Sequence, residues 1–171
     1  MKLGTQIFFM AGILVALMVL ISGYGISQMT LIGNEIKDVA EVDMPLIEVI
    51  TGITTHQLEQ GILFQRALRH GEVMSASVNA AEHFEHAEKG FEAWAKSVDE
   101  EIKKGEEIAR EAIKLAHSEE ARHEFQEILE HLEEIEREHV DFDKQAEHVF
   151  ELLHHGAMHE AHEAAEKVEH E

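Results

Sequence analysis

Histidines beside acidic residues are the groups in this chain whose type and spacing could do chemistry. The sequence has 171 residues, with 14 histidines, 35 aspartates and glutamates and no cysteine. Imidazole and carboxylate groups bind divalent metals, and imidazole also ligates haem iron and exchanges protons near neutral pH. Since the sequence lacks cysteine, disulfides, thiolate metal sites and a cysteine nucleophile are excluded.

Two histidines, His56 and His139, differ from the others because they fall on apolar helical stripes. If the helices pack in an antiparallel bundle, a rise of ~1.5 Å per residue puts His56 and His139 within roughly 10 Å of each other along the bundle axis. A hydrogen-bonded core histidine is the plain interpretation of each. The alternative is a polar layer that binds a small ligand, a metal or haem, formed by His56, Gln57, Gln60, Trp94 and His139.

The Glu-x-x-His spacing of di-iron bundles occurs three times between Glu120 and His154. All three matches lie on one predicted helix, and the two helices before it put no acid on their inner faces. A di-iron centre needs the motif on two helices and carboxylates from two more, so we do not expect one.

A second group of histidines surrounds Gly156, where a helix is expected to end. His155, His159 and His162 could form an exposed divalent-metal or pH-responsive patch. The alternative is that they are solvated side chains beside glutamates. The segment His159–His162 is one residue short of the spacing of zinc proteases.

Two arginines, Arg66 and Arg69, are the candidates for binding an anion. A planar guanidinium meets a carboxylate through two parallel hydrogen bonds, which gives both affinity and orientation. A surface pair offset by the nearby Glu59 or Glu72 is the alternative.

The charge of the chain limits its partners. Its 14 lysines and arginines leave a formal net charge of −21, and Lys2 is the only charged residue before Glu35. Such an acidic surface repels phosphate backbones, so we expect no nucleic-acid partner. No nucleophile constellation, phosphate loop or dinucleotide fingerprint is present, so we expect no enzyme activity.

Residues 7–26 form an uncharged apolar stretch, IFFMAGILVALMVLISGYGI. About 20 apolar residues span the hydrocarbon core of a bilayer as a helix. We therefore predict a cytoplasmic leader at 1–6 and a transmembrane helix at 7–26, with a signal-peptidase site at Ser22–Gly25 as the alternative. Lys2 before the stretch, with no positive charge directly after it, predicts that residues 27–171 lie outside the cytoplasm.

The acidic remainder, residues 27–171, is predicted to be helical. Apolar residues recur at three- and four-residue steps, which predicts helices over about 27–71, 76–117, 119–155 and 157–171. Pro45 should push Met44 out of helical geometry and cause a kink or a restart capped by Asp43. We expect an all-α protein in which one transmembrane helix continues into an antiparallel, incomplete four-helix bundle, so that the chain is cut or needs a partner.

This pattern resembles the amino-terminal part of a methyl-accepting chemotaxis protein. The resemblance is carried by residues 1–26, Asp43–Leu46, Glu136–Asp143, Glu147–Phe150, Gly156 and Ala164–Val168. It implies a homodimer in the bacterial inner membrane, with a periplasmic four-helix domain that senses a small molecule. Arg66 and Arg69 are similar to the carboxylate-binding arginines of amino-acid-sensing receptors of this family.

The sequence departs from the family because it has no second apolar span, cytoplasmic linker or methylated signalling hairpin. We therefore expect the ligand-sensing module of a chemotaxis receptor, without its own signalling part and without a cofactor. Two alternatives stay open. One is a membrane-anchored bundle that binds metal or haem through histidines, and the other is a single-pass scaffold that oligomerises through its short last helix.

Overall fold

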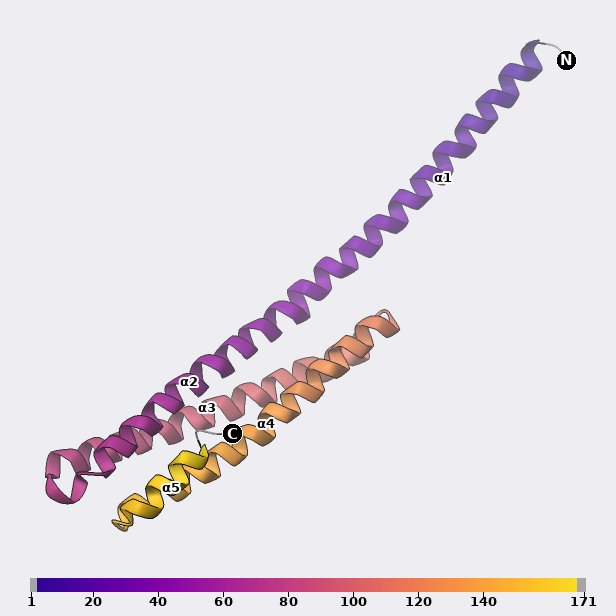
Figure 1. Ribbon diagram of the computed structural model, residues 1–171. Coiled ribbons are helices and arrows are strands. Elements are labelled where there is room, and N and C mark those ends of the chain that lie inside the picture. Colours follow the sequence, from indigo (N-terminus) through magenta and orange to yellow (C-terminus); the bar gives the residue numbers. More distant parts are fainter. Residues whose placement is uncertain (1–2, 169–171) are drawn as a thin grey trace. The chain divides into compact units, whose positions relative to one another are not determined.

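The computed structural model describes residues 3–168, and every element assigned in that range is helical. The elements are α1 (Leu3–Asp38), the π turn η1 (Val39–Asp43), α2 (Met44–Gly71), the 3-10 turn η2 (Met74–Ala76), α3 (Val78–Leu115), α4 (Glu119–His154) and α5 (Met158–Val168) (Figure 1). The protein is therefore all-α, as predicted. Residues 1–2 of the predicted leader and 169–171 of the predicted last helix lie outside the described range.

α1 carries the predicted transmembrane segment. Its large apolar side chains are exposed from Phe9 to Ile32, and the helix is long and apolar enough to cross a membrane. The chain divides into two compact units, the first ending at Met44 and the second beginning at Pro45. The apolar segment thus belongs to the first unit, and α2 to α5 make up the second.

The prediction that Met44 leaves helical geometry before Pro45 is wrong, because the helical backbone continues from Leu3 to Gly71 through the π turn. Met44 keeps helical angles, φ −63° and ψ −46°, and its N–H donates to the carbonyl of Val39, five residues back. Proline lacks an N–H, and its ring collides with the carbonyl four residues earlier in a regular helix. The wider π turn accommodates both effects, so Asp43 lies inside a turn rather than capping a new helix.

The ends of the helices in the second unit follow local sequence signals. The side chain of Ser77 accepts a hydrogen bond from the N–H of Ala80 at the start of α3, and Ser118 does the same for Ala121 at the start of α4. Gly156 follows α4 with φ 70°, a left-handed conformation that glycine adopts without strain. The predicted bounds of α3, α4 and α5 are correct to within three residues over the described range.

Replacing Ser118 by alanine should lower the free energy of unfolding by about 1 kcal/mol, because the first turn of α4 loses its side-chain acceptor. Urea unfolding followed by circular dichroism measures this loss. Ser97→Ala is the matched control, since the Ser97 hydroxyl only donates to the carbonyl of Ala93 within α3. The control should stay within about 0.5 kcal/mol of wild type, and equal losses in both variants would argue against the cap.

The inward faces of α2 to α5 form two hydrophobic clusters. The first cluster joins all four helices and includes Leu63, Phe64, Phe84, Phe91, Phe150 and Ala161. The second joins α2, α3 and α4 and includes Val49, Ile53, Ile102 and Leu132. α3 and α4 lie side by side in opposite directions, and α5 packs along α4 (Figure 1). The apolar stripes of the sequence are therefore the buried faces of these helices.

One acidic residue is buried against expectation. Glu106 of α3 is only 6% exposed, and one of its oxygens accepts a hydrogen bond from Arg110 at 3.0 Å. The preceding residue, Gly105, lets α3 approach its neighbours closely, because a Cβ there would lie 3.1 Å from Val49 and 3.2 Å from Leu132. This close packing and the pairing with Arg110 explain the burial, which the apolar pattern did not indicate.

Candidate functional site

Polar side chains of α2, α3 and α4 form a layer inside the second unit. Gln60 and the side chain of His139 are fully buried, and His56, Gln57 and Trp94 are half-buried. On α2, α3 and α4, these residues lie in the sequence between the residues of the first hydrophobic cluster and the residues of the second. The structure thus places the predicted residues in one layer, while their ligand-binding role stays a prediction.

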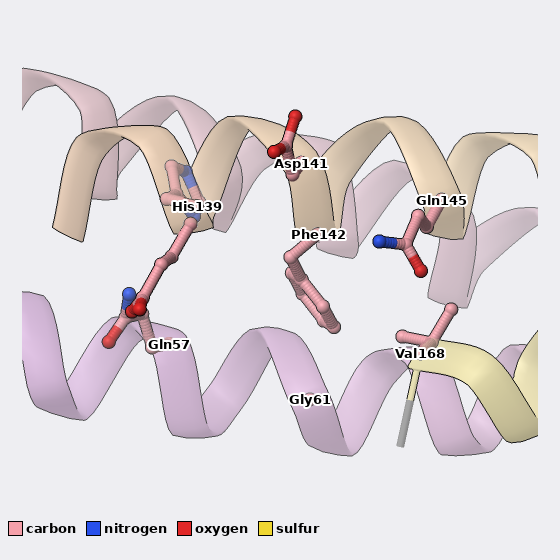
Figure 2. A pocket seen from close by; sticks show the side chains of 8 residues that line it. Gln57, Gly61, His139, Asp141, Phe142, Gln145 and Val168 are labelled. Carbon is pink, nitrogen blue, oxygen red and sulfur yellow. The ribbon is translucent and has the colours of Figure 1, made fainter. Parts of the chain in front are cut away.

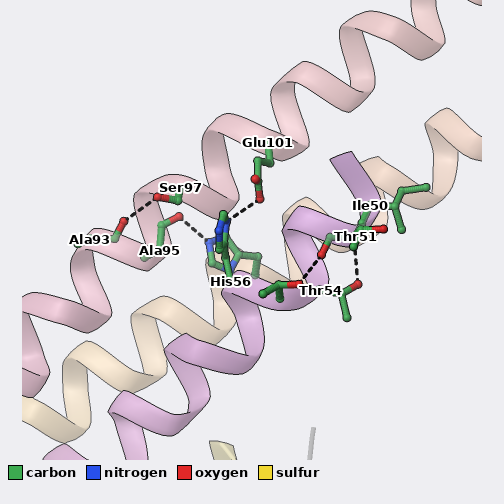
Figure 3. A network of polar contacts seen from close by, with 10 residues as sticks. Ile50, Thr51, Thr54, His56, Ala93, Ala95, Ser97 and Glu101 are labelled. Carbon is green, nitrogen blue, oxygen red and sulfur yellow. Dashed lines mark hydrogen bonds and ion pairs between the residues drawn. The ribbon is translucent and has the colours of Figure 1, made fainter. Parts of the chain in front are cut away.

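His56 joins α2 to α3 in two ways. Its Nδ1 lies 2.9 Å from an oxygen of Glu101 (Figure 3). Its ring stacks on that of Trp94, with the centroids 4.5 Å apart. The imidazole is therefore held by a carboxylate at its edge and an indole on its face. Both contacts leave it oriented toward α3 rather than toward solvent.

His139 is held by the backbone of α3. Its Nε2 lies 3.2 Å from the carbonyl oxygen of Ala95, 3.4 Å from Asp143 and 3.8 Å from Asp99. A carbonyl oxygen only accepts, so we assign the proton to Nε2. The other ring nitrogen, Nδ1, is buried and has no hydrogen-bond partner among the described residues. In the neutral imidazole this atom is an acceptor.

Asp143 completes the layer and was missed at the sequence level. The amide nitrogen of Gln60 donates to one carboxylate oxygen of Asp143, and His139 lies beside the other. The signal that could have revealed it is its position four residues after His139, on the same face of α4. Burial raises the pKa of Asp143 above its ordinary value, and the nearby His139 opposes that rise.

The raised pKa of Asp143 predicts the direction in which the stability of the protein changes with pH. The folded state binds this proton more readily than the unfolded state, so its contribution to stability grows as the pH falls through the folded pKa and is complete below the unfolded value. The free energy of unfolding of the wild type minus that of Asp143→Asn should therefore increase from about pH 7 to about pH 4.

Urea unfolding of the two proteins at several pH values measures this difference. Asp141→Asn is the control, because Asp141 lies on the exposed side of the same helix. A difference that stays constant or shrinks as the pH is lowered would contradict the burial of an ionisable Asp143.

A cavity of about 630 Å³ adjoins the layer between α2 and α4. Figure 2 shows Phe142 reaching from α4 toward α2, with Val168 of α5 closing one side. The cavity is lined by Gln57, Gly61, Glu138, His139, Asp141, Phe142, Gln145 and Val168. Of the polar layer expected to bind a ligand, Gln57 and His139 line this space, whereas His56, Gln60 and Trp94 do not.

Arg66 and Arg69 lie outside the polar layer, on the exposed side of α2. They line a second cavity of about 750 Å³, together with Leu58, Ile62 and Phe64. The two cavities share Gln57, Gly61, Phe142 and Val168 in their walls. We call these two adjoining cavities the groove. It has an acidic end at Glu138 and Asp141 and a basic end at Arg66 and Arg69.

The three histidines of the predicted metal patch are not brought together. His159 lies 3.6 Å from Glu163 and His162 lies 3.4 Å from Glu72, while His155 is exposed. Among the side chains that the structure describes, no group of three or more histidines, aspartates or glutamates is placed to hold a metal ion. The geometry therefore favours the solvated alternative for this part of the chain.

Comparison of the chain with protein-family models, with curated proteins and with solved structures found no match. Fold and site therefore define a class of protein only. Over the described residues, the class is an all-helical protein with one helix that is long and apolar enough to cross a membrane, and with a polar layer inside its helical core.

Proposed function

We propose that the chain is the extracytoplasmic ligand-sensing module of a chemotaxis-type receptor, tethered to the inner membrane by α1. The observation that carries this proposal is the unbroken helical backbone from Leu3 to Gly71. α2 contributes to both hydrophobic clusters and to the groove, and it follows α1, which holds the apolar segment, without a break in the helical backbone. A ligand that displaces α2 would therefore act on the chain that leads directly to the apolar segment. Such a ligand can shift the equilibrium between two positions of α2 only by the difference in its affinity for these positions.

The basic end of the groove supports the choice of a small-molecule ligand. Arg66 and Arg69 are three residues apart on α2 and line the same cavity, beside apolar Leu58 and Ile62. Two guanidinium groups next to an apolar wall suit a carboxylate on a hydrocarbon frame. The ligand would then bind along α2.

The outward face of α2 supports a homodimer. Ile47, Leu58 and Ile62 are each at least 44% exposed and lie on the side of the helix opposite its buried stripe. In a two-fold symmetric dimer the same stripe meets its own copy, so one set of apolar residues covers both partners. The arginines at the basic end would then lie near the dimer interface.

A hybrid receptor tests the sensing role. Residues 1–171 would be joined to the second transmembrane helix and signalling part of a chemotaxis receptor, and kinase output would be measured with a panel of small carboxylates and amines. We expect at least one compound to change the output. A hybrid that controls the kinase but responds to none of them would contradict the proposal.

Sedimentation equilibrium of the full chain in detergent tests the dimer. We expect a dimer for the wild type, a monomer for Leu58→Lys and a dimer for the control Leu115→Lys, since Leu115 is exposed at the end of α3. A monomeric wild type at high protein concentration would exclude the dimer.

A further inference from the structure

Ion pairs between different segments of the second unit depend mainly on histidine. Over the described residues, all of these pairs but one have an imidazole as the basic partner, namely His56–Glu101, His139–Asp99, His154–Glu88 and His162–Glu72. The exception is Arg110–Glu133. The lysine pairs of this unit each lie within one helix. Histidine as a residue type changes its charge between about pH 5 and pH 8, so the attraction between these helices should depend on pH.

His56 of α2 occupies a site on α3 that consists of an aromatic ring and a carboxylate. Its ring stacks on that of Trp94 at an angle of 26°, and its Nδ1 is paired with Glu101. Figure 3 shows this pair joining the two helices. Gly52, one turn earlier on α2, leaves room for Glu101, because a Cβ there would collide with the carboxylate. The side chains of His56 and Glu101 are only 25% and 26% exposed, so salt screens this pair less than a surface pair.

His154 of α4 occupies a second site of the same kind on α3. Its Nε2 lies 3.2 and 3.1 Å from the two oxygens of Glu88, and its ring is perpendicular to that of Phe84, with the centroids 4.9 Å apart. The side chain of Glu88 is 22% exposed. α3 therefore holds one histidine from α2 and one from α4, each against an aromatic ring and a carboxylate.

Both sites favour a charged imidazole over a neutral one. A carboxylate forms a stronger hydrogen bond with a cation than with a neutral donor, and an aromatic ring attracts a cation placed over its face. Glutamate as a residue type stays ionised over most of the range in which histidine changes its charge. Proton binding and the contact with α3 should therefore strengthen each other.

Other titratable groups surround the two sites. Around the histidine of α2, the polar layer contains Asp99 of α3 and Asp143 of α4, which also favour its charged form, and His139 of α4, which opposes it when protonated. Around the histidine of α4, Glu151 lies one turn earlier on the same helix, and Lys89 of α3 is paired with another glutamate. Among the described side chains, no second acid lies within 4 Å of a nitrogen of either imidazole.

We infer that α3 carries two proton-dependent contact sites, one for His56 of α2 and one for His154 of α4, and that each holds its helix more tightly when the histidine is protonated. Acid thus strengthens the contacts of α3 with both neighbours. Since the folded state favours the charged imidazoles, the stability that they contribute is present at low pH and is lost as the pH rises. This inference goes beyond the proposed ligand sensing and does not depend on it, because neither site lines the groove.

Double-mutant cycles on the full chain in detergent test this inference. One cycle combines His56→Gln with Glu101→Gln, and the other combines His154→Gln with Glu88→Gln. Urea unfolding at about pH 8 and at about pH 5.5 gives the coupling, which is the factor by which the effect of the double variant on the unfolding constant departs from the product of the single effects. In both cycles we expect a coupling of about five-fold at the lower pH and below about two-fold at the higher pH.

The matched control is the cycle of His123→Gln with Glu127→Gln, since this pair lies within α4 at 3.5 Å and both side chains are exposed. Its coupling should stay below about two-fold at both pH values.

Trp94 gives a second readout that requires no unfolding. It is the only tryptophan and stacks on His56, so its fluorescence should change between about pH 8 and about pH 5.5 as the imidazole gains its charge. His56→Gln should abolish this change, and His154→Gln should leave it. A coupling that does not increase as the pH falls, in either cycle, would overturn the inference. So would a Trp94 emission that is independent of pH, or a change with pH that persists in His56→Gln.

Discussion

Phe150→Ala is expected to lower the free energy of unfolding by about 3–5 kcal/mol. Phe150 is 3% exposed, and the centroid of its ring lies between 5.2 and 6.1 Å from those of Phe64, Phe84 and Phe91. Truncation removes contacts with α2 and α3 at once and leaves a cavity that the surrounding rings fill only in part.

Urea unfolding monitored by circular dichroism and by Trp94 fluorescence measures this loss. Leu115→Ala is the control, because Leu115 is 66% exposed, and its effect should be within about 0.5 kcal/mol. A loss below about 1 kcal/mol for Phe150→Ala would mean that the four aromatic rings do not form the packed centre of the second unit.

Leu17→Arg is expected to disfavour membrane insertion of α1 by about 2.5–3.5 kcal/mol, because Leu17 lies at the middle of the apolar stretch 7–26. A guanidinium at this depth has no water and no partner. The ratio of membrane-held to extracted protein should fall by more than ten-fold.

Ser27→Arg is the matched control for this experiment. Residue 27 follows the apolar stretch directly, so an arginine there can extend its side chain to the interface and should leave extraction nearly unchanged. Equal extraction of wild type and Leu17→Arg would show that α1 is not held in the bilayer core.

The helices and their buried faces could be predicted because they depend on local patterns. Ser77, Ser118 and Gly156 act within one helical turn, and each does what its residue type favours. Pro45 misled the prediction because a single residue type does not determine whether a helix restarts or widens into a π turn. The packing around Glu106 likewise depends on Gly105 and its neighbours on other helices, which no local pattern contains.

Part of the candidate site could likewise be predicted from the sequence, and the rest depends on the tertiary structure. The sequence by itself determined that His56, Gln60 and His139 lie on inward faces, because their spacing matches the helical repeat. Tertiary structure decided that Asp143 bridges Gln60 and His139, and that His139 donates to the backbone of α3. It also separated the arginines from that layer and gave the groove two ends of opposite charge. Partners on different helices depend on the rotation and register of each helix, and these are set by the packing of the whole core.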